Sequence, residues 1–190
     1  MSLACAALAL AALALGAPDA RAEGRLAKVR GHLSVGYSRL FIQDSPAGSF
    51  SIGAGLDYPL TGAWRVGVSL GNDLLGGRVV ERGSLIANVD YSVFEMLALA
   101  HWEPPRLGPV GRISFGPGLF SARGELSTAA GGASFSDLAV QEVAPGLALS
   151  GTLIKRGDSP VRVGLEAGLT VAFLDGDTWT VASARLAFHY

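Results

Sequence analysis

The chain closes with the sequence TVASARLAFHY, residues 180–190, in which two kinds of side chain alternate. Leu186, Phe188 and Tyr190 fall on one face of an extended strand, whereas Ser183 and Arg185 fall on the other. A strict period of two predicts a β-strand with one apolar and one more polar face. We therefore expect the chain to end on a β-strand whose last residue is aromatic.

The composition separates this chain from ordinary soluble domains. Its 190 residues are 49% hydrophobic and only 16% charged, against about 25% charged residues in a typical soluble domain. The length suits one domain, and the net charge of -1 gives no basis for nucleic-acid binding. The single cysteine, Cys5, lies in an N-terminal segment that we expect to be removed, so no disulfide is predicted.

The same alternation recurs along the chain and predicts eight strands. Short segments with Pro or Gly, such as 59–63 and 175–177, separate some of them, and the polar stretch 121–137 is expected to be a long loop. An even number of alternating strands, with short turns at one end and longer loops at the other, is typical of bacterial transmembrane barrels. The expected strands lie at residues 32–38, 49–58, 64–71, within 84–102, 112–119, 143–153, 161–173 and 180–190.

The fourth strand has the least regular pattern. Val89, Tyr91 and Val93 share one parity, whereas Met96 and Ala98 have the opposite parity. A β-bulge between the two parts would return both to one face. A helix over residues 94–102 is the alternative, because this stretch contains good helix formers.

Alternation alone does not decide which face points outward, because a soluble barrel has its apolar residues inside. Here the polar face consists mainly of Gly, Ser, Ala and Thr, whereas a water-facing surface normally carries many charges. Small residues also suit the narrow lumen of an eight-stranded barrel. We therefore predict an all-β fold, an eight-stranded antiparallel up-and-down transmembrane β-barrel. Two aromatic belts are expected at the membrane interfaces: Tyr58, Trp64, Trp102, Phe188 and Tyr190 at one end, and Phe41, Phe50, Phe173 and Trp179 at the other.

The N-terminal segment predicts export. Residues 3–15 form an apolar run too short to span a bilayer comfortably, and Ala20-Arg21-Ala22 matches an Ala-x-Ala cleavage site. We expect a signal peptide at residues 1–22, a short lead at 23–30 and the barrel at 31–190. A retained N-terminal helix is the alternative, since no Lys or Arg precedes the apolar run.

In its architecture and C-terminal pattern, the chain from residue 31 to 190 resembles the small OmpA/OmpX-like bacterial outer-membrane barrels. The resemblance implies a monomeric, integral outer-membrane protein of Gram-negative bacteria with both termini in the periplasm. It also implies that the outer-membrane assembly machinery reads the C-terminal strand, and that lipid and lipopolysaccharide contact the barrel. Arg78, Arg82 and Arg123 are expected in external loops, where they either pair with lipopolysaccharide phosphates or remain solvated.

The expected lumen contains charged residues, which need partners in so dry a space. Four arginines with at least two carboxylates predict a salt-bridged interior, and eight strands leave little bore for a pore. The favoured function is therefore non-enzymatic, a structural or surface-interaction role around a plugged polar lumen. The lumen-facing set is His32, Asp57, Arg65, Arg112, Arg162, Glu166 and Arg185.

A lipid A-modifying enzyme is the alternative function. His32 and Ser34 share one strand face, and a carboxylate such as Glu166 that orients the imidazole would complete the minimum set for a serine hydrolase. The three candidates resemble the His-x-Ser pair and Glu of outer-membrane lipid A deacylases. Here, however, the pair lies earlier in the chain and faces the lumen, so we assign no catalytic residue.

Pro117 and Pro145 give a second hint of lipid chemistry. Each removes a donor from the ladder, so the seam between the fifth and sixth strands is expected to be weak. Lipid A palmitoyltransferase barrels resemble this in using proline-broken seams as lateral doors for lipid. We favour the simpler explanation that both prolines lie at bulges or near the rim.

Other activities find little support in the sequence. An OmpW-like conduit for small hydrophobic molecules would need an apolar lumen that opens sideways, and the expected lumen is polar. His32, His101 and His189 are isolated in the sequence, so no metal site is predicted. No nucleotide motif is present either, and no cofactor is expected.

Overall fold

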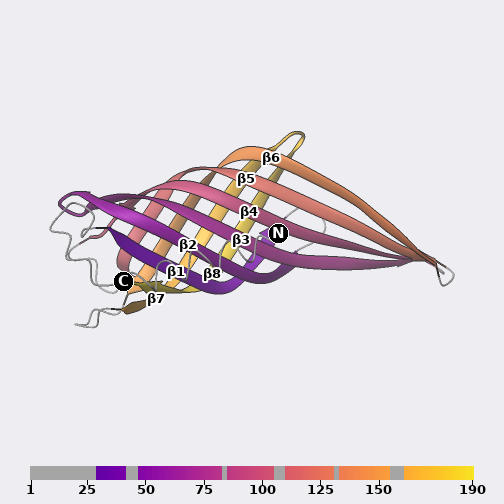
Figure 1. Ribbon diagram of the computed structural model, residues 1–190, viewed down its shortest axis with the longest axis horizontal. Coiled ribbons are helices and arrows are strands. Elements are labelled where there is room, and N and C mark those ends of the chain that lie inside the picture. Colours follow the sequence, from indigo (N-terminus) through magenta and orange to yellow (C-terminus); the bar gives the residue numbers. More distant parts are fainter. Residues whose placement is uncertain (1–28, 42–46, 83–84, 105–109, 131–132, 155–160) are drawn as a thin grey trace.

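Eight antiparallel strands close into one barrel, in which each strand pairs with the next and β8 pairs back with β1 (Figure 1). This computed structural model describes residues 29–41, 47–82, 85–104, 110–130, 133–154 and 161–190. Within these ranges, no helix is long and apolar enough to cross a membrane. The strands are β1 (Arg30–Phe41), β2 (Ala47–Thr61), β3 (Trp64–Arg82), β4 (Leu85–Trp102), β5 (Val110–Ala130), β6 (Ala133–Ile154), β7 (Arg162–Leu174) and β8 (Asp177–His189).

The all-β, eight-stranded antiparallel fold is confirmed, and the stretch that predicted it closes the ring. Leu186 on β8 pairs with Val35 on β1. The backbones of Gly31 and Tyr190 exchange hydrogen bonds of 3.0 and 3.1 Å, which complete the seam. We call the end where β1 begins and β8 ends the proximal end, and the opposite end the distal end. The expected signal peptide, residues 1–22, and the lead up to residue 28 lie outside the described residues and stay predictions.

The side chains of the strands point alternately out of and into the barrel. On the outer face, Val68 is 59% exposed and Leu147 is 54% exposed. On the inner face, Ser51, Arg65 and Arg185 are buried. The exposed wall is therefore apolar and the interior contains the charges, as the alternation predicted.

The strands are longer than predicted at the distal end. The expected loop at 121–137 is mostly strand, because β5 continues to residue 130 and β6 begins at 133. Arg78 and Arg82 lie in β3 and Arg123 lies in β5, so none of the three lies in a loop. The sequence gives no sign of these extensions. In a hairpin that is solvated on both faces, cross-strand pairing satisfies the hydrogen bonds of the backbone, so neither face needs to be apolar.

Both interpretations of the fourth strand are wrong. β4 is one continuous strand through Trp102, so no helix forms, and its register with β5 is constant from Leu85↔Ala130 to Trp102↔Ile113. The bulge lies in the partner strand instead, where the register of β3 shifts between Leu74 and Gly76. Gly76 has a φ of 70°, a value that glycine adopts without strain.

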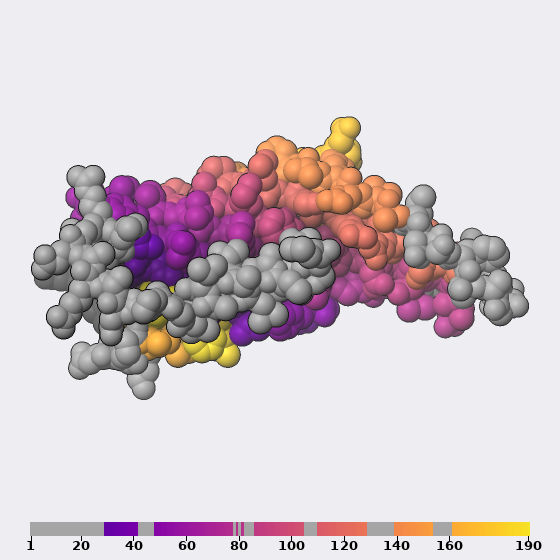
Figure 2. Space-filling view, in the orientation of Figure 1, coloured from indigo at the N-terminus to yellow at the C-terminus, as the bar shows by residue number. Residues whose placement is uncertain are grey.

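The distal parts of β3 to β6 form a four-stranded sheet that projects beyond the rest of the barrel (Figure 1). The β2–β3 ladder reaches only Ser51↔Asp73, and the β6–β7 ladder begins at Gly146↔Ala172. Beyond these pairs, β3 no longer pairs with β2 and β6 does not pair with β7, so the four strands pair only with one another. Together they narrow toward one end of the molecule (Figure 2). We call this part the projecting sheet: residues 76–82 of β3, 85–91 of β4, 124–130 of β5 and 133–140 of β6.

Candidate functional site

The proximal third of the lumen contains a cluster of ion pairs. Arg65 on β3 pairs with the buried Asp57 on β2 and also donates to its backbone carbonyl at 3.2 Å. Arg112 on β5 reaches both Asp57, at 3.2 Å, and Glu103, at 3.0 Å. Arg30 pairs with Glu103 at 3.3 Å. We call these five residues the proximal cluster. The proximal cluster therefore links β1 to β5 across the bore, whereas a ladder links only neighbouring strands.

A second cluster lies deeper and is centred on Arg185 of β8. Its guanidinium bonds Asp73 at 3.0 Å, Glu95 at 3.2 and 3.3 Å, and Ser51 at 2.6 Å. Thr170 donates to Glu95 at 3.4 Å. These contacts connect β8 to four other strands and pair the buried carboxylates of Asp73 and Glu95, and we call them the Arg185 cluster.

Sequence reasoning placed Arg185 in the lumen but missed both of its acidic partners. Asp73 lies past the expected end of the third strand, and Glu95 lies where the parity of the fourth strand was ambiguous. The proximal Glu103 was missed as well, since it follows the end of β4. The remaining members of the expected lumen set do face inward: His32, Asp57, Arg65 and Arg112 are buried, and Arg162 and Glu166 are partly buried.

The distal part of the barrel interior is apolar. Glycines make room for the largest member, the fully buried Phe120, since a Cβ at Gly146 would lie 2.6 Å from its ring. Trp179, which we expected in the distal aromatic belt, packs against this core and meets Tyr91 edge-on at 5.7 Å between ring centroids. Its odd position in β8 points it inward. The core consists of Leu40, Leu75, Val93, Leu97, Phe120, Ala172 and Val181.

Together, these three layers close the bore. Among the described residues, a polar cavity of about 40 Å³ lies within the bore, with room for only a few water molecules. The lumen is therefore plugged by ion pairs proximally and by packed side chains distally.

The three catalytic candidates share this cavity but form no relay among the described residues. His32, Ser34 and Glu166 all line it. Glu166 accepts a hydrogen bond from Thr152 at 3.3 Å, and Nδ1 of His32 has no hydrogen-bond partner within the described part of the chain. An activated serine needs a base in hydrogen-bond contact with it, and no such contact links His32 to Ser34 in the described structure.

The histidines are not isolated in space, contrary to the sequence interpretation. His32 and His189 are register partners on β1 and β8, and their ring centroids lie 5.8 Å apart. His101 Nδ1 lies 2.8 Å from Ser114 Oγ, its direct neighbour on β5. Within the described ranges, no three His, Cys, Asp or Glu side chains are grouped to hold a metal ion.

The outer wall has aromatic residues at both ends. Proximally, Trp64 stacks on Trp102 at 6.4 Å and meets Phe115 edge-on at 6.2 Å, both measured between ring centroids. Distally, Phe41 and Phe173 are about half exposed, at 49% and 48%. Of the expected belt residues, Trp64 and Trp102 lie together at the proximal end and Phe41 and Phe173 lie at the distal end, as two membrane interfaces require, whereas Trp179 points inward.

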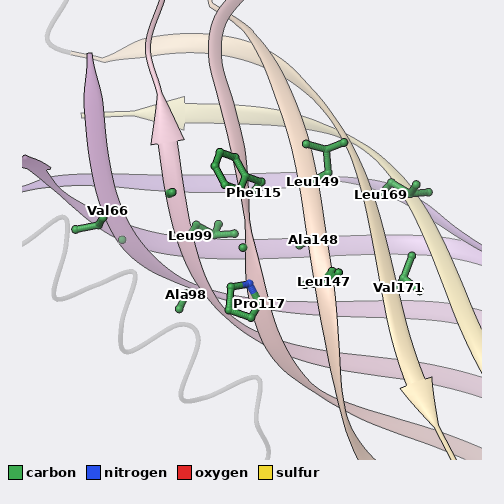
Figure 3. A pocket seen from close by; sticks show the side chains of 13 residues that line it. Val66, Ala98, Leu99, Phe115, Pro117, Leu147, Ala148, Leu149, Leu169 and Val171 are labelled. Atoms are coloured by element: carbon green, nitrogen blue, oxygen red, sulfur yellow. The ribbon is translucent and has the colours of Figure 1, made fainter. Parts of the chain in front are cut away.

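An apolar hollow of about 650 Å³ lies on the outer wall over β3 to β7 (Figure 3). Pro117 is one of the residues that line it, and the β4–β5 ladder has no pair between Leu97↔Gly118 and Ala100↔Phe115. The β5–β6 ladder instead runs unbroken through Pro117 and Pro145. The weak seam is therefore on the β4 side of β5, not between β5 and β6, and neither proline lies at a bulge.

Comparison with known proteins shows which class of protein has this architecture. No protein-family model and no curated protein sequence matches the chain. The structure of Neisserial surface protein A (NspA) is similar, with a TM-score of 0.60 and 14% sequence identity over 85% of this chain and 96% of that one. The attachment invasion locus protein Ail of Yersinia pestis, solved with the heparin analogue sucrose octasulfate, has a TM-score of 0.50 and 15% identity over 86% of this chain and 99% of that one. The fold is thus that of a small outer-membrane β-barrel protein, the class that the sequence resembles.

Proposed function

We propose that this chain is an integral protein of the bacterial outer membrane with a plugged lumen, and that it acts through surface interaction rather than catalysis or transport. One observation carries the proposal: the exposed wall is apolar while the charges are paired inside. Such an inversion of polarity is stable only where the wall meets hydrocarbon instead of water.

The shape of the barrel supports an orientation with both termini in the periplasm. At the proximal end only residues 62–63 join β2 to β3, whereas at the distal end β3–β4 and β5–β6 extend beyond the barrel wall as the projecting sheet. In bacterial barrels the short turns are periplasmic and the long connections are extracellular. In this orientation the projecting sheet extends outside the cell as the surface for partners.

Three further partners belong to this proposal. The apolar wall contacts membrane lipid. The exposed guanidinium of Arg123, already paired with Glu125, lies where lipopolysaccharide phosphates are found in the proposed orientation. The terminal strand, with exposed Leu186 and a final Tyr190, has the pattern that the assembly machinery reads. No second copy is needed to close the sheet, so the proposed state is a monomer.

Two measurements on the refolded protein test the proposal. The folded barrel should migrate faster on gels before boiling than after, and it should add no steady conductance to a planar bilayer, because the lumen leaves only about 40 Å³. Stable conductance from a protein with heat-shifted migration would contradict the plugged lumen. Absence of any heat-shifted form in lipid would contradict the membrane barrel.

The enzymatic alternative is tested separately. Lipid A incubated with the refolded protein should keep its mass spectrum, because His32 and Ser34 form no nucleophile–base pair. A change of one acyl-chain mass that disappears in the His32→Ala variant would establish an enzyme and overturn the proposal.

A further inference from the structure

The apolar hollow on the outer wall runs across five strands, from β3 to β7 (Figure 3). Two rows of outward-facing register partners line it. The proximal row is Val66, Ala100, Phe115, Leu149 and Leu169, and the distal row includes Pro117, Leu147 and Val171. Because the hollow follows these rows across the strands rather than one strand along its length, we call it the wall slot.

Small residues keep the wall slot open. On its outer face β4 contributes only Ala98 and Ala100, between the larger Val66 of β3 and Phe115 of β5. An empty hollow would forfeit the dispersion contacts of the atoms that line it, so we expect an occupant to fill it. Besides Leu99, the inward-facing positions between the two rows are Gly67, Gly116 and Ala148.

The lining of the wall slot restricts what can fill it. Every described residue that lines it is Val, Gly, Ala, Leu, Phe or Pro, so no side chain offers a hydrogen bond. A sugar or an extended peptide would leave its own polar groups unpaired there, at a cost of several kcal/mol for each group in hydrocarbon. The occupant must therefore be apolar along its whole buried length.

The wall slot lies next to the proximal aromatic belt. Val66 follows Trp64 by two positions on β3, and Phe115 meets Trp64 edge-on at 6.2 Å between ring centroids. Aromatic girdles mark the membrane interfaces of a barrel, so the wall slot opens into the leaflet whose headgroups lie at the proximal end. In the proposed orientation this is the periplasmic leaflet, on the opposite side of the membrane from lipopolysaccharide.

The dimensions of the wall slot suit one hydrocarbon chain. Four steps between neighbouring strands make it roughly 19 Å long, and two residues along a strand separate its rows by about 7 Å. The chains of one leaflet span about 15 Å, half of the hydrocarbon core, so one chain fits lengthwise. An α-helix with its side chains is about 10–12 Å wide and does not fit between the rows. An apolar cavity of about 150 Å³ holds benzene, and the wall slot measures about 650 Å³.

We propose that the wall slot is a binding site for one acyl chain of a phospholipid from the periplasmic leaflet. The proposal rests on the membrane location proposed above and adds a defined lipid site to it. Lipid chains are as apolar as the side chains of the wall, so van der Waals packing decides which lipid stays. A chain inside the slot packs against both rows and the floor, whereas a chain elsewhere on the wall packs against one surface.

Counting the bound lipid is the first test. The refolded barrel in detergent is titrated with dipalmitoyl phosphatidylethanolamine, and native mass spectrometry measures the complexes. Binding should saturate at one phospholipid per barrel. Addition of several lipids without saturation would overturn the proposal, and so would a second copy of the chain bound in place of lipid.

Matched variants locate the bound lipid. Ala98→Phe combined with Ala100→Phe fills the wall slot on β4 and should abolish the saturable binding. Ala54→Phe adds the same bulky side chain to the outer face of β2, between the exposed Ile52 and Leu56 and outside the slot, so it should keep the bound lipid. Equal binding by the filled variant and by Ala54→Phe would overturn the assignment.

Photo-cross-linking tests the unaltered protein in liposomes and does not depend on whether the variants refold. A phosphatidylethanolamine with a diazirine in one acyl chain should label Phe115 and Pro117 more strongly than Leu186. Leu186 is 49% exposed and lies on β8, four strands away from β4 in the closed ring. Equal labelling of the two sides would overturn the proposal.

Heat-shifted migration of the same sample separates two kinds of failure. Absence of a shifted form contradicts the membrane barrel itself. A shifted barrel that is labelled evenly contradicts the wall slot alone and leaves the proposed function intact.

Discussion

Inside this barrel each buried charge has few partners, so single residues matter strongly to the ion-pair network. The guanidinium of Arg185 pairs with both Asp73 and Glu95. The sequence predicted which positions face inward from the period of two, and this held for Asp57, Arg65, Arg112 and Arg185. It did not predict the pairing, because partners such as Arg185 and Glu95 are 90 residues apart and meet only through barrel closure.

The Arg185→Met variant tests the Arg185 cluster. Removing the guanidinium leaves Asp73 and Glu95 buried without their common cation, so the free energy of unfolding should fall by about 3–5 kcal/mol. Urea titration of the refolded barrel measures it. Arg123→Ala, which breaks an exposed pair with Glu125, is the control and should cost less than about 1 kcal/mol. Equal losses in both variants would show that the buried network contributes nothing special.

Two glycines of β6 test the packing of the distal interior. A methyl group at Gly146 would meet first the backbone carbonyl oxygen of Val171 and then the ring of the fully buried Phe120, so Gly146→Ala should destabilise the barrel by about 1–3 kcal/mol. A methyl at Gly151 meets no atom within 4 Å, so Gly151→Ala should be close to neutral. Unfolding midpoints compare the two variants, and a neutral Gly146→Ala would mean that the core is loosely packed.

The strands were predicted where one of their faces is apolar, and they were missed where neither face is apolar. The eight strand positions follow from alternation, but the distal extensions of β3 to β6 do not. The change of apolar parity in β4 also misled the sequence analysis. Val93 faces the apolar distal core and Met96 faces outward on one uninterrupted strand, so no bulge in β4 is needed. The bulge at Leu75 lies in β3, and the apolar pattern of β3 does not mark it.

Pro117→Val tests the seam between β4 and β5. The β4–β5 ladder lacks its pairs at Pro117, so a residue with an N–H should restore one hydrogen bond and stabilise the barrel by about 0.5–1.5 kcal/mol. Pro145 lies just beyond the first β6–β7 pair, Gly146↔Ala172, and Pro145→Val should bring no such gain. Urea unfolding of both variants decides, and a stabilised Pro145→Val beside an unchanged Pro117→Val would place the weak seam elsewhere.

Trimming the projecting sheet tests whether it is independent of the barrel. A variant in which short turns replace residues 78–89 and 126–138 should still refold and keep its heat-shifted migration, because the core and both ion clusters lie outside these segments. If the trimmed chain no longer folds, the sheet is part of the barrel's stability rather than a surface for partners.

For the molecule as a whole, the decisive feature is which face of the barrel wall meets lipid. The composition predicted it, since a polar face of small residues with few charges cannot be a soluble surface, and in the described part of the chain 27 large hydrophobic residues are exposed. A soluble barrel of this sequence would expose that wall to water at about 25 cal/mol for each Å² of apolar area. The sequence predicted a lumen closed by ion pairs. It did not predict the apolar distal half of the interior, because Leu40, Leu75 and Val181 break the pattern in which apolar residues face outward.

Tryptophan quenching by lipids with brominated acyl chains shows directly which face of the wall meets lipid. Single-tryptophan variants can report each face in turn, since Trp64 lies on the outer wall, 41% exposed, whereas Trp179 packs against the interior core. In brominated liposomes, Trp64 should be strongly quenched and Trp179 only weakly. Quenching of Trp179 as strong as that of Trp64, or no quenching of either in a folded barrel, would contradict this assignment of the two faces.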